Sequence, residues 1–295
     1  MEIHFEIENQ CLLRCRHCSS MASKSKRKMK YSEQDMIRLL KGIDGEKDVF
    51  LTGGEPLLYT NLAGLLNDLQ TRVPDIKLGM FTTGIISHSG KAGAISAKYA
   101  EKLAECGLKV CYLSVYSHLE QAHDWMTKLQ GSYKMLNDSI RHFRAAGVEI
   151  RFNSVVTKRN MSYFDDIIEF AERAGAAEVR ILKLIRQGRA AECWGDIGVT
   201  EQDYKNVIQN TLKRKNKLRI TASGAIDILP CRYGCKLQIC PAGIGLLYVT
   251  NNGDILPCAS VKRNAEYIIG NIGEEDIVKK WHLFQKESDG KMLCK

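Results

Sequence analysis

The 295-residue sequence lacks the features that would direct a chain to a membrane or out of the cell. No run of about eighteen apolar residues is present, so no membrane-spanning helix is expected. The first ten residues, MEIHFEIENQ, are acidic and strand-like, without the basic and apolar regions of a signal peptide. Eleven cysteines without an export signal therefore predict a reducing, cytoplasmic location, where clustered cysteines bind metal or carry out redox chemistry more often than they form disulfides.

The sequence also lacks the motifs of several large enzyme classes. There is no phosphate-binding P-loop, no dinucleotide-binding GxGxxG and no arrangement typical of a serine triad. Internal repeats and low-complexity tracts are absent as well. The chemistry of the chain must therefore be sought in its cysteines and in the polar residues near them.

Strand and helix patterns alternate regularly along the first two thirds of the chain. Helical patterns run from Ser32 to about Gly42 and over 60–72, 92–106, 133–145 and 162–174. Six strands are predicted between them, at residues 2–7, 48–54, 76–84, 108–117, 148–157 and 177–185. This alternation predicts parallel strands joined by right-handed crossovers, as in a closed or partly closed α/β barrel or an open doubly wound sheet. In each of these folds, functional groups lie at the carboxyl ends of the strands.

The pattern changes after about residue 190. A helix is expected after Thr200, and LLYVT, NNG and DILPC together predict a β-hairpin in a cysteine-rich segment. We therefore expect two domains, 1–190 for the α/β unit and 191–295 for a smaller C-terminal unit.

Three cysteines lie within eight residues, in the stretch CLLRCRHC from Cys11 to Cys18, with Cys15 between them. Thiolates are soft ligands that suit zinc or iron–sulfur clusters. Structural zinc is usually closed by four ligands, whereas three cysteines on a cluster of four irons leave one iron open to a substrate or cofactor. A zinc site completed by His17 is the alternative, although it would leave the GGEP segment at Gly53 unexplained.

The spacing C-x3-C-x2-C after the first strand resembles the cluster motif of the radical SAM superfamily. Gly53-Gly54-Glu55-Pro56 after the second strand is identical to the GGEP element of that family. HD…T…GS, from His123 to Ser132, and RQGRA, at 186–190, are similar to elements of its peptide-modifying branch. The resemblance implies a partial (β/α)6 barrel that holds a [4Fe–4S] cluster and S-adenosylmethionine (SAM).

The resemblance also implies roles for single residues. The cluster would be held by Cys11, Cys15 and Cys18, and Arg186 would pair with the SAM carboxylate, with Arg180 as the alternative of the same strand parity. The expected cofactor-binding set is His17, Gly53, Gly54, Glu55, Pro56, Ser114, Asn153 and Arg186.

A second cysteine group resembles the opening of the SPASM pattern, in which a C-terminal extension binds auxiliary clusters. Its members are Cys231, Cys235, Cys240 and Cys258, while Cys294 is the only later cysteine. The closely spaced later cysteines of the full pattern are missing, which implies one auxiliary [4Fe–4S] cluster in a shortened twitch-type arrangement. Its fourth ligand could be Cys231 or Cys294, and a structural zinc ribbon remains the alternative.

The resemblance implies an enzyme that cleaves SAM to a 5′-deoxyadenosyl radical and abstracts hydrogen from a ribosomally made peptide, to epimerise a residue or cross-link side chains. The alternative substrate is a sugar, an aminoglycoside or a nucleotide. An electron donor of the flavodoxin or ferredoxin type is the expected partner. The net charge of +9 and the run KSKRKMK at 24–30 are consistent with an acidic partner or a solvated loop. A basic zinc protein that binds nucleic acid is the remote alternative.

Overall fold

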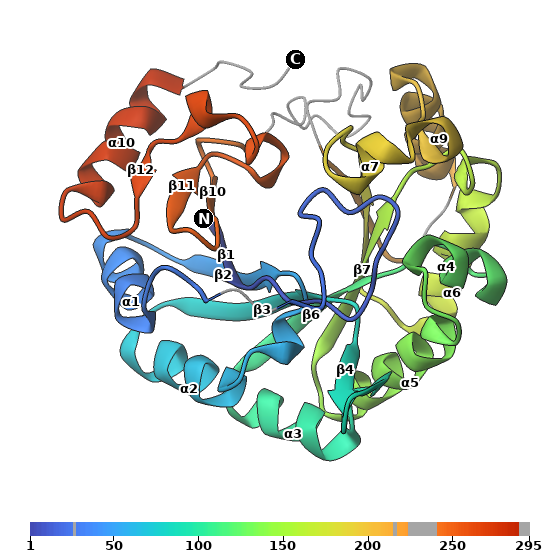
Figure 1. Cartoon of the computed structure of the whole chain (residues 1–295), viewed down its shortest axis with the longest axis horizontal. Coiled ribbons are helices and arrows are strands. Elements are labelled where there is room, and N and C mark those ends of the chain that lie inside the picture. The colour runs from blue at the N-terminus through green and yellow to red at the C-terminus, as the bar shows by residue number, and fades with distance from the viewer. Residues whose placement is uncertain (26–27, 215–216, 224–240, 289–295) are drawn as a thin grey trace.

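The computed structural model describes residues 1–25, 28–214, 217–223 and 241–288. A ten-stranded sheet forms its centre (Figure 1). Six adjacent parallel strands in its middle begin and end within three residues of the six predicted ones. They are β1 (Glu2–Glu8), β2 (Lys47–Gly53), β3 (Ile76–Thr82), β6 (Leu108–Ser114), β7 (Glu149–Val155) and β8 (Glu178–Leu182).

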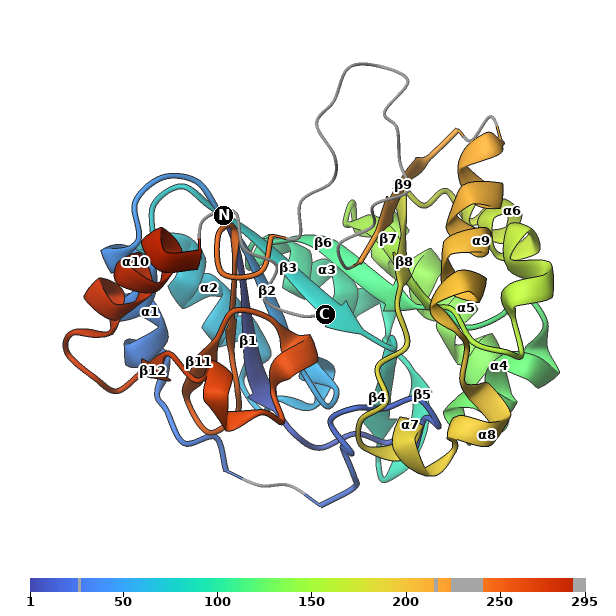
Figure 2. The same ribbon diagram turned by 90° about the horizontal axis from the view of Figure 1, so that it is seen from above.

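Strands from the last third of the chain extend this sheet at both edges (Figure 2). Strand β9 (Arg219–Ala222) pairs parallel to β8, and β10 (Leu246–Val249) pairs parallel to β1. Strand β11 (Asp254–Leu256) continues from β10 as the antiparallel hairpin that the sequence predicted, and β12 (Gly270–Asn271) follows. In the described part of the chain β9 and β12 are edge strands that do not pair with each other, so the sheet is curved and open, as expected for a partial barrel. The division at residue 190 stays a prediction.

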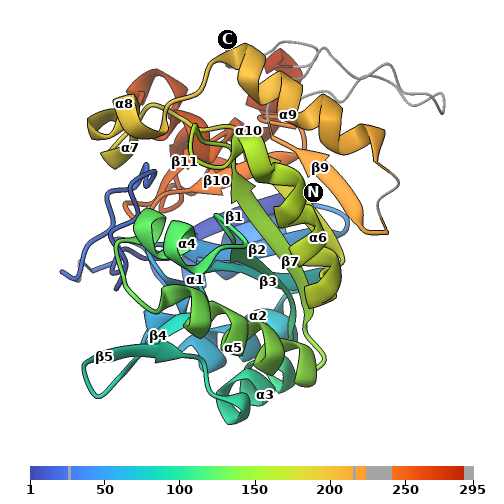
Figure 3. The same cartoon turned by 90° about the vertical axis from the view of Figure 1, so that its right-hand side faces the viewer.

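Helices cover the convex face of the sheet (Figures 1 and 3). They include α1 (Glu33–Gly42), α2 (Leu62–Arg72), α3 (Ala97–Glu105), α5 (Ser132–Ala145) and α6 (Phe164–Ala174). Helix α1 begins with a capping box, because Ser32 Oγ accepts from Asp35 N and Asp35 Oδ2 accepts from Ser32 N. Helix α9 (Glu201–Lys213) begins with the same device at Thr200, where a helix was expected. None of the described helices is long and apolar enough to cross a membrane.

The expected helix over 92–106 is wrong in its first turn. Strands β4 (Ile85–His88) and β5 (Lys91–Ala94) form a hairpin there, around a turn in which Ser89 and Gly90 both have positive φ. This combination is typical of a two-residue hairpin turn. Helix α3 begins only after Ser96, whose Oγ accepts a hydrogen bond from Tyr99 N. The sequence analysis did not predict helices α4 (Glu120–Thr127), α7 (Arg189–Glu192), α8 (Trp194–Ile197) and α10 (Ile277–Ser288).

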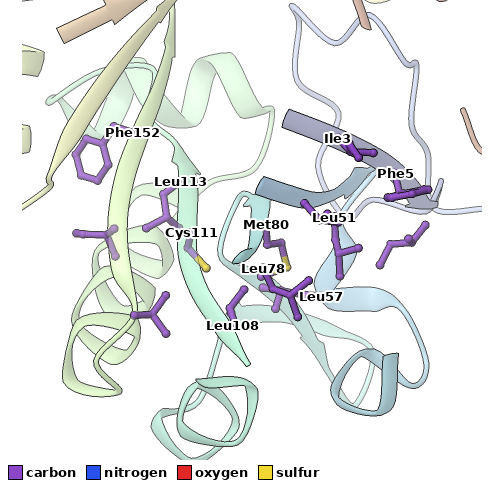
Figure 4. Close-up of a cluster of buried hydrophobic side chains, with 14 of the residues drawn as sticks. Ile3, Phe5, Leu51, Leu57, Leu78, Met80, Leu108, Cys111, Leu113 and Phe152 are labelled. Atoms are coloured by element: carbon purple, nitrogen blue, oxygen red, sulfur yellow. The ribbon is translucent and has the colours of Figure 1, made fainter. Parts of the chain in front are cut away.

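Alternation along the strands separates the core from a cavity. Leu51, Met80, Cys111, Leu113 and Phe152 are buried in the hydrophobic core (Figure 4). Their neighbours in sequence point to the concave face, since successive side chains of a strand alternate between the two faces. A cavity of about 650 Å³ is lined there by such alternate residues, among them Glu2 and His4, Phe50 and Thr52, Arg151 and Asn153, Arg180 and Leu182, and Leu246 and Tyr248.

Candidate functional site

The three cysteines of the first loop line the cavity at the carboxyl ends of the strands. Cys11 and Cys15 are buried and Cys18 is half-buried. Burial raises the pKa of Cys11 to about 12, and the charges of Glu55 and then Cys18 add to this shift. The pKa of Cys15 is raised well above its ordinary value, chiefly by burial and then by Cys11 and Cys18. Cys11 and Cys15 are therefore protonated at neutral pH until a metal binds and displaces their protons.

The three thiols border one cavity. Within the described ranges, no three His, Cys, Asp or Glu side chains converge as ligands of a single metal ion. His17 lines the same cavity, but its ring packs 4.5 Å from the ring of Tyr116. Burial and the nearby charge of Arg189 lower the pKa of His17 to about 4, so the ring is neutral. A donor set of three thiols around one cavity suits an iron–sulfur cluster, in which each thiolate binds its own iron.

Gly53 and Gly54 allow the backbone of β2 to contact the segment that enters the cysteine loop. Gly54 N donates to Glu8 O at 2.6 Å, and Glu55 N donates to Gln10 O at 2.8 Å. A Cβ on Gly53, at φ +130°, would lie 2.0 Å from Glu8 O, and one on Gly54 would lie 2.3 Å from Gln10 O. The contact that requires glycine is thus with the protein backbone, although both residues also line the cavity.

Glu55 lies behind the cavity wall and joins the ends of β2 and β3. It is fully buried, and its carboxylate accepts hydrogen bonds from Thr82 Oγ1 at 2.5 Å, from Thr83 N at 2.8 Å and from Thr83 Oγ1 at 2.5 Å. Burial raises the pKa of Glu55 despite these bonds. Pro56 is buried and begins a short 3-10 turn. The roles of these two residues in cofactor binding stay predictions.

The carboxyl end of α4 holds the cysteine loop from the opposite side. Arg14 N donates to Thr127 O at 3.1 Å, and Arg16 N donates to Met126 O at 2.9 Å. In Figures 1 and 3 the dark blue cysteine loop lies beside α4. This contact explains why α4, which the sequence analysis did not predict, matters to the site.

The HD…T…GS element fixes α4 against the start of α5. Asp124 accepts hydrogen bonds from Ser132 Oγ at 2.7 Å, from Tyr133 N at 2.8 Å and from Gly131 N at 2.5 Å. Thr127 Oγ1 lies 2.7 Å from Ser132 Oγ. These contacts make the element a support for the cysteine loop, one helix away from the thiols.

The arginine that reaches the cysteine loop is Arg189, which the sequence analysis did not single out. It is buried, and its guanidinium donates to Cys15 O at 2.9 Å and to Ala22 O at 3.0 Å. Arg186 instead lies over the ring of Trp194, 5.5 Å from its centroid, and is not among the lining residues of the cavity. The pairing of Arg186 with the SAM carboxylate stays a prediction.

Several polar atoms around the cavity have no hydrogen-bond partner among the described residues. Asn153 Oδ1, Gln187 Oε1 and His17 Nδ1 are buried and make no hydrogen bond among the described residues, and all three side chains line the cavity. Ser114 lines it as well. Buried polar atoms are normally satisfied, so these atoms fit a site whose polar ligand completes them. A cofactor with amino, carboxylate and ribose groups, such as SAM, has the chemistry to do so.

The floor of the cavity, at the amino ends of the strands, carries charges that are paired. Arg180 donates to Glu2 Oε1 at 3.0 Å and to Tyr112 Oη at 2.8 Å. Glu178 is buried, and Arg151, Arg180 and Arg219 surround it within ion-pair distance. This end of the cavity is a saturated ionic network.

Cys258 lines the same cavity as the three thiols of the first loop. Its Sγ accepts a hydrogen bond from Ser260 N at 3.4 Å, and the short turn after β11 begins at this residue. The other three members of the second group and the later Cys294 lie outside the described residues: Cys231, Cys235, Cys240 and Cys294.

Comparisons with known proteins agree with this geometry. The model of the radical SAM superfamily matches residues 5–171. The chain is 23% identical over 300 residues to the AdoMet-dependent heme synthase of Oleidesulfovibrio alaskensis, covering 95% of this chain and 74% of the relative. It is 23% identical over 282 residues to the PqqA peptide cyclase of Rhizobium meliloti, covering 94% of this chain and 72% of the relative.

The fold is similar to that of SuiB from Streptococcus suis, solved with bound S-adenosylmethionine, with a TM-score of 0.69 and 16% identity. The match covers 95% of this chain and 65% of SuiB, so the chain spans less than two thirds of that protein. A second structure of SuiB contains its precursor peptide SuiA. With the family model matching more than half of its residues, the chain belongs to the radical SAM superfamily and is an enzyme of that family.

Proposed function

We propose that the chain uses a [4Fe–4S] cluster and SAM to abstract hydrogen from a peptide. When bound, the cluster would pass one electron from an external donor to SAM, which would yield methionine and a 5′-deoxyadenosyl radical able to take a hydrogen atom from the substrate. The observation that carries the proposal is one cavity with three thiols at its mouth and unpartnered polar atoms beside them.

The residues of the chain have separate tasks in this proposal. Cys11, Cys15 and Cys18 would hold the cluster, with Arg189 fixing the loop between them. Asn153, Gln187, His17 and Ser114 would orient SAM. The proposal assigns no proton transfer to any of these residues.

The peptide class is supported by the names of relatives and neighbours, which include the PqqA peptide cyclase and SuiB with its precursor peptide. A second candidate is a small molecule on the route to heme, because the first three relatives found are AdoMet-dependent heme synthases that align with at least 95% of this chain. The arginines around the cavity floor are paired with carboxylates, and they offer no separate support to an acidic small molecule.

An auxiliary cluster is the second part of the proposal. Cys258 lines the cavity and is the one described member of the expected ligand set of this cluster. That set comprises Cys231, Cys235, Cys240 and Cys258, with Cys294 as an alternative ligand. A cluster there would border the same space as the first one and could exchange an electron with the substrate. An external flavodoxin or ferredoxin-type protein is the proposed electron source.

Anaerobic reconstitution tests the function. We expect about eight irons per chain, and 5′-deoxyadenosine after SAM and dithionite are added. The Cys11→Ala/Cys15→Ala/Cys18→Ala variant should keep about four irons and form no product, whereas Cys258→Ala should retain the SAM-cleaving cluster. Zinc without iron, and no 5′-deoxyadenosine, would contradict the proposal.

The substrate class requires a separate experiment. Deuterated candidate peptides and a deuterated carboxylated porphyrin would be supplied in turn, and deuterium in 5′-deoxyadenosine measured by mass spectrometry. Transfer from a peptide supports the first candidate, while transfer from the porphyrin alone supports the second.

A further inference from the structure

A second cavity of about 970 Å³ lies outside the cluster cavity, as a groove between α4 and the loop that follows β7. None of the assigned roles uses it. Its walls include Leu119, which is 50% exposed, and the aromatic rings of Trp125 and Tyr163. The loop after β7 forms a firm wall, because the buried Asn160 Nδ2 donates to Tyr116 O and to Val155 O at 3.0 Å each.

Two arginines without carboxylate partners flank the indole of this groove. The guanidinium of Arg16 lies 4.1 Å from the ring centroid of Trp125, and that of Arg159 lies 4.7 Å from it. Arg16 also donates to Trp125 O at 3.1 Å. Among the described residues no carboxylate lies within ion-pair distance of either guanidinium, and both positive charges lie against the same aromatic ring.

The two acidic residues that line the groove already have partners within the described structure. Asp124 accepts hydrogen bonds from three donors at the start of α5. Glu120 forms an ion pair with Lys134 at 3.3 Å. Arg159 supplies the positive charge of the wall and is exposed there beside apolar and aromatic surface. The complementary ligand is anionic and partly apolar.

The groove is mechanically joined to the cluster loop. Arg16 lies between Cys15 and His17, and its backbone N donates to Met126 O at the end of α4. Tyr116 lines both the groove and the cluster cavity. A chain anchored in the groove therefore has its neighbouring residues beside the mouth of the reaction cavity.

We propose that this groove, named here the α4 groove, binds an acidic segment of the peptide substrate next to the residue that is modified. The inference rests on the proposed function, since it takes the substrate to be a peptide. Arg159 pairs with an acidic side chain of the segment, and Leu119 and Trp125 contact an adjacent apolar one. The groove thereby provides affinity outside the reaction cavity and selects substrates by charge.

Tryptophan fluorescence gives a direct measure of binding. The chain has three tryptophans, of which Trp281 is fully buried and Trp194 packs under Arg186. Reconstituted enzyme with SAM would be titrated with three ten-residue probes of alternating Glu and Leu, Gln and Leu, or Lys and Leu. We expect the Glu probe to change the emission and to bind about tenfold tighter than the Gln probe, while Trp125→Phe removes the signal.

Charge reversals at two adjacent residues distinguish binding in the α4 groove from attraction by the net charge of the protein. Arg159→Glu should lower the affinity for the Glu probe about tenfold or more and raise the affinity for the Lys probe. Lys158→Glu is the matched control, since Lys158 is exposed, carries the same charge and does not line the groove. It should change affinity by less than about threefold.

Each of the other outcomes overturns the inference. Equal effects of the two reversals would show that net charge alone attracts the probe. If Arg159→Glu slows reduction of the cluster by an acidic flavoprotein and leaves probe affinity unchanged, the groove binds an electron donor instead. If 5′-deoxyadenosine forms but no probe binds, the proposed role of the groove is refuted and the proposed function stands. If a probe binds but no 5′-deoxyadenosine forms, the proposed function is refuted.

Discussion

The mouth and the floor of the cluster cavity are built in opposite ways. At the mouth, backbone groups hold the cysteine loop in place, and side-chain atoms such as Asn153 Oδ1 have no partner in the described part of the chain. At the floor, side chains hold one another, and the charges of Glu2, Glu178 and Arg180 are matched. The same strands supply both ends, since Asn153 lies two residues beyond Arg151 on β7.

The difference separates a binding region from a supporting one. Unsatisfied buried polar atoms cost free energy that a ligand recovers, so their presence at the mouth indicates where a ligand belongs. Paired charges at the floor have no such need, and they fix the separation of β1, β7 and β8 instead. Removing an unpartnered side-chain atom at the mouth should therefore change cofactor binding, and removing a paired charge at the floor should change stability.

The largest effect is expected where the backbone of the mouth is most crowded. Gly53→Ala places a Cβ 2.0 Å from Glu8 O at a φ of +130°, so the strand or the cysteine loop must move. We expect a loss of more than about 3 kcal/mol in the free energy of unfolding, together with loss of cluster incorporation. Urea denaturation of the metal-free protein and iron analysis after reconstitution measure the two effects.

Gly45→Ala is the matched control for this substitution. Gly45 also has a positive φ, +78°, but no atom lies within 4 Å of its added Cβ. It should cost about 1 kcal/mol and leave iron content unchanged. Equal costs for the two variants would mean that backbone conformation, and not the contact with Glu8, explains the glycine.

The next largest loss of stability is expected when one charge is removed from the ionic network at the floor. Glu178→Gln removes a buried negative charge that faces the guanidiniums of Arg151, Arg180 and Arg219. Removing one partner from a buried ionic cluster leaves the others uncompensated, and we expect a loss of about 3 kcal/mol in unfolding free energy. The affinity for SAM, measured by equilibrium dialysis on the reconstituted protein, should change less than about threefold. A large loss of SAM affinity at unchanged stability would reverse the assignment of floor and mouth.

The sequence was sufficient for the features that depend on local pattern. Apolar alternation predicted all six central strands, and the Ser32 and Thr200 caps marked the starts of their helices. The spacing of Cys11, Cys15 and Cys18 predicted a shared site, and the three residues line one cavity.

Features that depend on contacts distant in sequence could not be predicted in this way. The resemblance implies Arg186, with Arg180 as the alternative of the same strand parity, but β8 ends at Leu182, and parity has no meaning beyond the end of a strand. Arg189 reaches Cys15 O across 174 positions of sequence, which no local pattern encodes. Likewise, the GGEP pattern does not reveal that Thr82 and Thr83 from the next strand occupy the carboxylate of Glu55.

The pH dependence of stability offers a smaller test of the floor. Burial alone would raise the pKa of Glu2, but the hydrogen bond and charge of His4 and the charge of Arg180 lower it to about 2. Because the folded pKa lies below the unfolded one, the stabilisation from Glu2 is present above about pH 4.5 and is lost as the pH falls toward 2. Glu2→Gln should therefore reduce the change in unfolding free energy between pH 5.5 and pH 3 by about 1–2 kcal/mol, a figure discounted for the 27% exposure of this side chain.

Urea denaturation at the two pH values measures this change. Glu101→Gln, an exposed carboxylate on α3, is the control and should leave the slope unchanged. Identical pH slopes in the Glu2→Gln variant and the parent protein would show that Glu2 is not tied to Arg180 in solution.

The smallest effect on stability should come from a side-chain substitution at the mouth, and this substitution tests the contrast between mouth and floor most directly. Asn153 Oδ1 has no partner among the described residues, so Asn153→Ala removes no hydrogen bond of that oxygen from the metal-free protein. Deleting an unsatisfied buried acceptor relieves its desolvation penalty, and the unfolding free energy should change by less than about 0.5 kcal/mol.

The affinity of the reconstituted enzyme for SAM should nevertheless fall about tenfold, since the ligand loses one hydrogen bond at a buried site. Asn153→Leu, of similar volume and uncharged, also lacks the acceptor and separates loss of the hydrogen bond from loss of volume. If Asn153→Ala destabilises the metal-free protein as much as Glu178→Gln does, the orphan oxygen has a structural partner in solution, and the contrast between mouth and floor fails.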